Sequence, residues 1–116
     1  MTVAGTVGGS QAVDAQRFPS TETDLYQVSR ALKAMGHPLR LKILCALARD
    51  GEASVQDLID FAGTTQSNVS QHLSILRDKD ILTFRKVANR VYYRIGDENI
   101  VRLMELMQDA FCSPGR

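Results

Sequence analysis

Apolar residues recur at three- and four-residue steps in the first patterned part of the chain, which is the spacing of one helix face. The first stripe starts after Asp24 and ends before Gly36, a residue typical of helix C-termini. Pro38 begins a second helix, because a proline at the first helical position loses no hydrogen bond. This second helix is apolar around much of its circumference, so we expect it at the buried centre of the domain. Its apolar residues are Leu41, Ile43, Leu44, Cys45, Leu47 and Ala48.

Two shorter helices with a glycine between them are predicted next. Ser54 is a suitable N-cap for the first of these helices, and Gly63 ends it. Thr64 or Thr65 can cap the second, which extends to Lys79. Two helices joined by a tight turn of this kind form a helix-turn-helix. The residues of the second helix that share its inward phase are Val69, His72, Leu73 and Leu76.

A hairpin and a last helix complete the pattern. Residues 82–87 and 91–95 are rich in β-branched and aromatic side chains, and residues 88–90 between them favour a turn. Asp97 can cap the last helix, for which residues 113–115 act as a stop. The predicted fold is mainly α with a small β-hairpin, a winged helix-turn-helix in the order ααααββα. The apolar stripe of the last helix is Ile100, Leu103, Met104, Met107 and Phe111.

The length of 116 residues allows one domain with a real core and is too short for a second domain of ordinary size. Residues 1–20 are rich in Gly, Thr, Ser and Ala without periodicity, so we expect a flexible N-terminal tail. No apolar run approaches the roughly 20 residues of a membrane helix, and the start does not resemble a signal peptide. We therefore expect a cytoplasmic protein with no membrane partner.

Charge is distributed unevenly although the net charge is only +1. Residues 64–96 carry six basic and two acidic side chains, a local charge of +4, whereas the remainder carries eight basic and eleven acidic, or −3. A local basic surface on a nearly neutral protein suits a small nucleic-acid reader, because phosphate attraction acts only where the duplex touches.

The helix over residues 65–79 is the candidate DNA reader. Its outward side chains near the N-terminus are short, uncharged and able to hydrogen-bond base edges in a groove. A polar helix face in isolation is usually only solvated, but here a tight turn precedes it, a hairpin follows it and basic residues surround it. Our DNA-binding candidates are Gln66, Ser67, Asn68, Ser70, Gln71 and Ser74, with Arg77, Arg85, Lys86 and Arg90 as phosphate contacts.

Two segments carry a family resemblance, LKAMGHPLRLKIL at residues 32–44 and QSNVSQHLSILR at residues 66–77. Both resemble the ArsR/SmtB family, and the resemblance covers residues 24–112. It implies a homodimeric repressor that an inducer releases from operator DNA, with residues 21–116 as the DNA-binding and dimerisation domain. We expect the dimer to form through the first and last helices. The candidate dimer residues are Leu25, Val28, Leu32, Ile100, Leu103 and Met107.

Metal sensing is not favoured, although the family contains metal sensors. Those members carry a cysteine-rich motif at the helix equivalent to residues 54–62, or Asp and His ligands on the last helix. This sequence has neither, and His37 and His72 are its only histidines, so one chain cannot assemble a His-rich zinc site. We expect no resident metal and no cofactor, and a metal shared between two copies stays open.

The two cysteines are 67 positions apart, and in a reducing compartment such a pair is either inert or redox-active. Most isolated free cysteines are small buried hydrophobes. Cys45 and Cys112 nevertheless resemble the dithiol pair of the sulfide- and persulfide-responsive branch of the family. That resemblance implies that reactive sulfur species link Cys45 to Cys112 and lift repression.

Three other functions are compatible with parts of this sequence. A repressor with structural cysteines and another inducer, or a metal inducer, fits the same reading helix. A thiol-dependent enzyme would usually show a Cys-x-x-Cys motif or a cysteine opening a helix, and this chain shows neither, so we expect no enzyme. A dimeric protein-interaction module could use the same architecture without DNA, since a fold does not fix a function.

Overall fold

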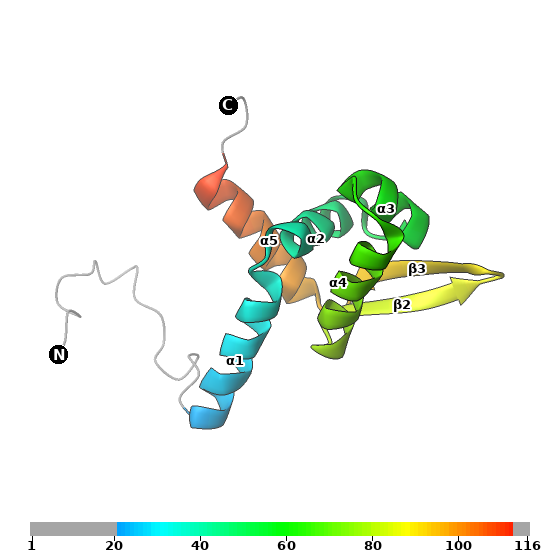
Figure 1. Cartoon of the computed structure of the whole chain (residues 1–116). Coiled ribbons are helices and arrows are strands. Elements are labelled where there is room, and N and C mark those ends of the chain that lie inside the picture. The colour runs from blue at the N-terminus through cyan, green and yellow to red at the C-terminus, as the bar shows by residue number, and fades with distance from the viewer. Residues whose placement is uncertain (1–20, 113–116) are drawn as a thin grey trace.

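The computed structural model describes residues 21–112 (Figure 1). The expected tail at residues 1–20 and the expected stop at 113–115 lie outside these residues. The described part confirms the mainly α winged helix-turn-helix and adds one short strand to the predicted order. Its elements are α1 (Glu22–Met35), α2 (Pro38–Asp50), β1 (Ala53–Ser54), α3 (Val55–Ala62), α4 (Gln66–Asp78), β2 (Leu82–Val87), β3 (Arg90–Ile95) and α5 (Glu98–Phe111).

Side-chain caps fix where the helices begin. Ser54 accepts a hydrogen bond from the Asp57 backbone N–H while the Asp57 carboxylate accepts one from the Ser54 N–H, which satisfies two otherwise unpaired donors of α3. Thr65, and not Thr64, caps α4 by accepting from the Asn68 N–H at 3.1 Å. Asp97 caps α5 as predicted, by accepting from the N–H of Asn99.

The core gathers around α2, as its apolar circumference predicts. Ile43, Leu44 and Leu47 of α2 are fully buried, and they pack in one cluster with Leu58 of α3. Helix α4 contributes its inward stripe to the same cluster, so α4 is anchored by its apolar side. The buried residues of this stripe are Val69, Leu73 and Leu76.

The sheet has three antiparallel strands in the order β1-β3-β2. Strand β1 pairs Ala53 with Tyr93 and Ser54 with Tyr92, and at two residues it is too short to show the alternation that identifies a strand in a sequence. The predicted three-residue hairpin loop is wrong by one position. Arg90 pairs with Val87, so the connection consists of two residues.

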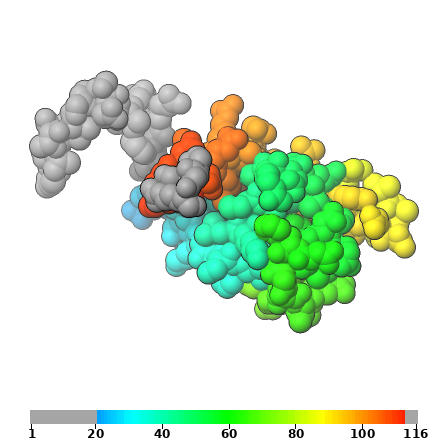
Figure 2. Space-filling model, turned by 90° about the horizontal axis from the view of Figure 1, so that it is seen from above, coloured from blue at the N-terminus to red at the C-terminus, as the bar shows by residue number. Residues whose placement is uncertain are grey.

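The hairpin and the apolar ends of α1 and α5 lie at opposite sides of the molecule. Figure 1 shows β2 and β3 extending away from the helices on one side, with α1 and the end of α5 on the other. The space-filling view along the perpendicular direction shows the same projection of the hairpin (Figure 2). Among the described helices, none is long and apolar enough to cross a membrane.

Candidate functional site

The outward face of α4 is open to solvent. Gly63 ends α3 in the left-handed conformation, with φ of 71°, which a residue without Cβ adopts at no steric cost. The turn that follows sets α4 with its apolar stripe inward, so its polar side chains point out. Asn68 differs from the other candidates, because it is half-buried and donates to the Thr64 hydroxyl at 3.3 Å. The exposed reader candidates are Gln66, Ser67, Ser70, Gln71 and Ser74.

The basic candidates of the reading region have different surroundings. Arg77, Lys86 and Arg90 are exposed, and the Arg77 guanidinium lies 5.1 Å from the centre of the Phe84 ring. Arg85 instead donates two hydrogen bonds to Glu52, at 2.7 and 2.9 Å. The charge of Arg85 is therefore already compensated by a carboxylate within the chain.

A polar hollow joins α4 to the hairpin. It has a volume of about 510 Å³, and Gln66 and Ser70 of α4 face Asn89 and Arg90 of the hairpin across it. Gln56 of α3 completes its polar lining. The structure thus brings reader candidates and a basic hairpin residue, which are separated in the sequence, onto one surface.

The two cysteines are exposed in the single chain. The interpretation of both as buried hydrophobes therefore does not hold for the isolated chain, although Cys45 lies between the buried residues Leu44 and Ala46. Cys45 is in α2, and Cys112 follows α5 directly as its C-cap residue. Because α2 and α5 pack together, both thiols belong to the same pair of helices.

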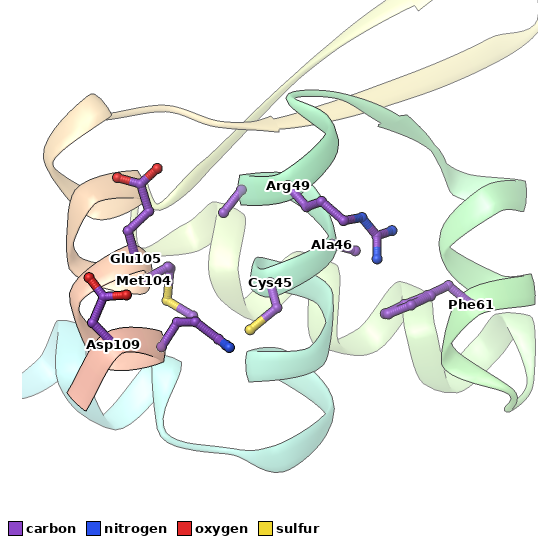
Figure 3. A pocket seen from close by; sticks show the side chains of 9 residues that line it. Cys45, Ala46, Arg49, Phe61, Met104, Glu105 and Asp109 are labelled. Atoms are coloured by element: carbon purple, nitrogen blue, oxygen red, sulfur yellow. The ribbon is translucent and has the colours of Figure 1, made fainter. Parts of the chain in front are cut away.

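A groove of about 640 Å³ contains Cys45 (Figure 3). In Figure 3 the Cys45 sulfur points toward the α5 side, where Met104, Glu105 and Asp109 lie, and Phe61 of α3 lies on the opposite side. The Arg49 guanidinium is 5.3 Å from the centre of the Phe61 ring. The thiol is therefore reachable by a small molecule while its surroundings are partly apolar.

The Cys45 thiol is less acidic than an ordinary cysteine. Partial burial raises the pKa of Cys45, and the negative charge of a Cys112 thiolate raises it further. The direction of this second effect follows from like charges, which disfavour one another's ionisation. Cys45 is consequently protonated at neutral pH and becomes a nucleophile only on losing its proton.

A second cluster, absent from our predicted site, ties α4 to α1 and α2. Arg40 of α2 donates to His72 of α4 at 3.0 Å and also to the backbone carbonyl of Ala34 near the end of α1. The His37 and His72 rings lie with centroids 4.5 Å apart. His37 is the N-cap of α2, since its Nδ1 accepts from the Leu39 N–H. No local motif predicts this cluster, because its residues come from separate segments of the chain.

The candidate dimer residues divide into two groups. Leu25, Val28 and Leu32 of α1 are 51%, 42% and 54% exposed, and Met107 of α5 is exposed as well. Ile100 and Leu103 are half-buried and pack against the core of their own chain. Three further exposed apolar residues on these helices were not among the dimer candidates, and these are Tyr26, Leu106 and Phe111.

Within residues 21–112, no three His, Cys, Asp or Glu side chains converge in a way that could hold a metal ion. Glu105 and Asp109 lie beside the Cys45 groove, but they come with a single thiol and no imidazole. The described part of one chain therefore offers no set of ligands of the kind that zinc prefers.

Comparison with known proteins identifies relatives over most of the chain. The family described as "Bacterial regulatory protein, arsR family" matches residues 37–83. The biofilm growth-associated repressor of Agrobacterium fabrum is 35% identical over 97 residues, which are 84% of this chain and 82% of that repressor.

Several solved structures have a similar fold. Reduced HlyU from Vibrio cholerae has a TM-score of 0.73 at 34% identity, over 79% of this chain and 96% of HlyU. The homodimeric winged helix-turn-helix DNA-binding domain of Mb0332 from Mycobacterium bovis, a possible ArsR-family regulator, has a TM-score of 0.72 at 32% identity. That match covers 84% of this chain and 89% of the domain.

Proposed function

This chain belongs to the arsR family of bacterial regulatory proteins, and we propose that it is a homodimeric repressor whose operator binding ends when sulfur links Cys45 to Cys112. As a winged helix-turn-helix of this family it is a DNA-binding transcriptional regulator, and its relatives are regulators and not enzymes, in agreement with our expectation. The inducer and the sensing residues belong to the proposal.

The observation that carries the proposal is the placement of the two thiols. Cys45 and Cys112 are both exposed, and Cys45 lies in α2, which packs against α5, the helix that Cys112 follows directly. Two cysteines kept only for packing have no need to be accessible. One of the similar solved structures is of reduced HlyU, so the redox state of a protein with this fold has been distinguished before.

DNA binding rests on the surface that α4 and the hairpin share. The exposed polar face of α4 can enter a major groove, where Gln71 can form two hydrogen bonds with an adenine and Ser70 can accept or donate. Lys86 and Arg90 of the hairpin are exposed and can contact phosphates beside that groove.

Dimer formation rests on the apolar surface of α1 and α5. These helices expose Leu25, Leu32 and Phe111. Figure 1 shows α1 and the end of α5 at the side of the molecule away from the hairpin. Several large exposed apolar side chains on two helices indicate a protein interface. The similar domain of Mb0332 is homodimeric, and two copies of this chain would place two reading helices against one duplex.

The sulfur chemistry needs two thiols and a persulfide as co-reactant. A thiolate of the pair attacks the outer sulfur of a persulfide RSSH, so that the protein gains a persulfide group and the thiol RSH departs. The second cysteine then attacks the inner, protein-bound sulfur and expels hydrogen sulfide. The sum is one RSSH and two cysteines giving one disulfide, one RSH and one H₂S. A trisulfide consumes a second RSSH and releases a second RSH.

Linking α2 to α5 would connect the core to the dimer surface. Helix α2 packs against the reading helix α4, whereas α5 carries exposed apolar residues of the candidate interface. A covalent tie between α2 and α5 therefore favours one arrangement of the two reading heads over another. In a reducing cytoplasm both thiols rest in the reduced form, so the DNA-bound state is the default.

The test compares DNA affinity and covalent state in the same samples. Reduced full-length protein, Cys45→Ser and Cys112→Ser are each titrated on a duplex of about 30 base pairs selected by the wild-type protein from a random pool, a length that accommodates two half-sites one turn apart. Each is then treated with a persulfide or with the parent thiol, and its intact mass is recorded. We expect affinity to fall only for wild type, only with the persulfide, and only when the mass shows a Cys45–Cys112 link.

Two other results would assign the function differently. Tight DNA binding that is unaffected by sulfur would leave a repressor with structural cysteines and another inducer, such as a metal shared between protomers. Binding that is absent, or indifferent to salt, would favour a protein-interaction module, because phosphate contacts weaken steeply as salt rises.

A further inference from the structure

Arg40 connects three helices through one guanidinium group. It lies in α2, its Nε donates to the Ala34 carbonyl near the end of α1, and its Nη1 is 3.0 Å from Nδ1 of His72 in α4. The residue is half-buried, so it is only partly solvated. Because α1 carries exposed apolar residues of the candidate dimer surface and α4 carries the reader candidates, Arg40 lies on the path between the two.

The protonation state of His72 follows from this contact. A guanidinium group can only donate, so Nδ1 of His72 must accept, and the ring proton is on Nε2. His37 lies beside this contact, with its ring centroid 4.5 Å from that of His72, and its own Nδ1 accepts from the Leu39 N–H. The cluster is therefore built for a neutral His72, and a proton on its Nδ1 would place two donors against each other.

We propose that Arg40 is a positioning residue for DNA recognition, which holds α4 in its reading orientation through neutral His72, and that protonation of His72 weakens DNA binding. The side chain before His72 is the reader candidate Gln71, and the side chain after it is the buried Leu73. His72 therefore lies between the exposed face and the buried face of α4. This proposal depends on DNA binding but not on the cysteine chemistry.

The electrostatic surroundings of His72 agree with this role. Burial lowers the pKa of His72 below its ordinary value, and a positive charge on His37 or on Arg40 lowers it further. Helix α4 packs against α1, α2, α3 and β2. Within residues 21–112, the charged groups that act on His72 are His37, at the α1–α2 junction, and Arg40, in α2.

His72→Asn is the decisive variant. An asparagine amide places an acceptor oxygen near the position of Nδ1 and does not titrate in this range, so the contact with Arg40 is kept while the pH response is removed. His72→Leu removes the acceptor altogether, and Arg40→Gln removes the charged donor. All are made in the full chain, kept reduced, and tested on the selected duplex of about 30 base pairs from about pH 7.5 to about pH 5.5.

We expect the wild type to lose roughly tenfold in affinity across this pH range, the size of a charge-assisted hydrogen bond. His72→Asn should bind like wild type at the upper pH and lose clearly less on acidification. Arg40→Gln should bind roughly tenfold more weakly at the upper pH and keep the wild-type slope of log affinity against log salt, whereas loss of a direct phosphate contact would reduce that slope by about 1.

Controls separate positioning from folding. Circular dichroism and sedimentation record the fold and the dimer of each variant at each pH. A His72→Leu variant that does not fold leaves the decision to His72→Asn. The proposal is overturned if His72→Asn loses affinity with acid as wild type does, or if Arg40→Gln either binds unchanged or reduces the salt slope.

Discussion

Glu52 accepts two hydrogen bonds from Arg85, at 2.7 and 2.9 Å, and so joins the residue before β1 to the first strand of the hairpin. The guanidinium of Arg85 also lies 5.1 Å from the centre of the Tyr92 ring. A phosphate that needs Arg85 must compete with the Glu52 carboxylate for the same donors. The Glu52–Arg85 pair is thus expected to reduce the number of hairpin arginines and lysines that contact phosphates.

Glu52→Gln should release Arg85 to the duplex. We expect tighter DNA binding and a slope of log affinity against log salt that is steeper by about 0.9 for each additional phosphate that the protein neutralises. Glu98→Gln in α5 changes the net charge equally without freeing an arginine, and its slope should stay at the wild-type value. Equal slopes for wild type and Glu52→Gln would mean that Arg85 does not reach a phosphate.

Ser70→Ala and Gln71→Ala should reduce sequence-specific binding. Loss of a bidentate Gln71 contact is expected to cost about 1–3 kcal/mol of discrimination, while binding to unrelated duplexes stays almost constant. Gln108→Ala removes a glutamine from α5 and serves as the matched control. Unchanged affinity for the selected duplex in both reader variants, with the fold intact, would show that this face of α4 is not the reader.

Acid should destabilise the fold through His72. Its pKa in the folded chain is lowered from 6.5, so the unfolded chain binds the proton first. The contribution of neutral His72 is therefore complete above pH 6.5 and is lost as pH falls through the lowered pKa of the folded state. Urea unfolding of wild type and His72→Asn measures this difference. A decrease in stability with acid that is the same for both would assign the effect to other groups.

Cys45 should react slowly with alkylating agents at neutral pH. Because its pKa is raised from 9.0, its thiolate fraction is smaller than that of an ordinary cysteine. Cys112→Ser removes the second cause of the shift, so the alkylation rate of Cys45 should increase and its pH profile should move toward lower pH. Mass spectrometry after iodoacetamide treatment gives both rates. An unchanged profile would mean that the two sulfurs do not interact.

The hairpin turn contains a strained residue that glycine would relieve. Ala88 has φ of 57°, in the left-handed region that costs a residue with Cβ roughly 1–2 kcal/mol. Ala88→Gly should therefore raise the free energy of unfolding by up to about 1 kcal/mol, since glycine also gains freedom in the unfolded chain. Asn89→Gly is the control, because Asn89 does not have a positive φ, and it should be neutral or destabilising. Urea midpoints compare the two.

Local patterns predicted most of the helices and strands because each such signal is short. The caps at Ser54 and Asp97, the stripe of α4 and the hairpin all depend on residues within a few positions of one another. Strand β1 was missed because two residues show no period, and the hairpin loop was placed one residue too long because a two-residue turn with alanine in the left-handed region is unusual.

The contacts that define the site could not be predicted in this way. Arg40 and His72 are 32 positions apart, and Glu52 and Arg85 are 33 positions apart, so only the tertiary arrangement brings them together. Periodicity marked Ile100 as part of an apolar stripe, but it could not distinguish a side chain that packs in its own core from one that faces a partner. The candidate DNA-binding and thiol residues could be named from the sequence because they stand in segments that resemble the family.

Strand β1 ties the hairpin to the helix-turn-helix. Ser54 pairs with Tyr92 of the hairpin and is at the same time the N-cap of α3, so the hairpin and the helix-turn-helix share one residue of backbone. A signal that tilted the hairpin alone would have to break this pairing and the cap together. A link between Cys45 and Cys112 is therefore expected to act through the spacing and angle between two reading heads, because the joint between the hairpin and α3 stays intact within each head.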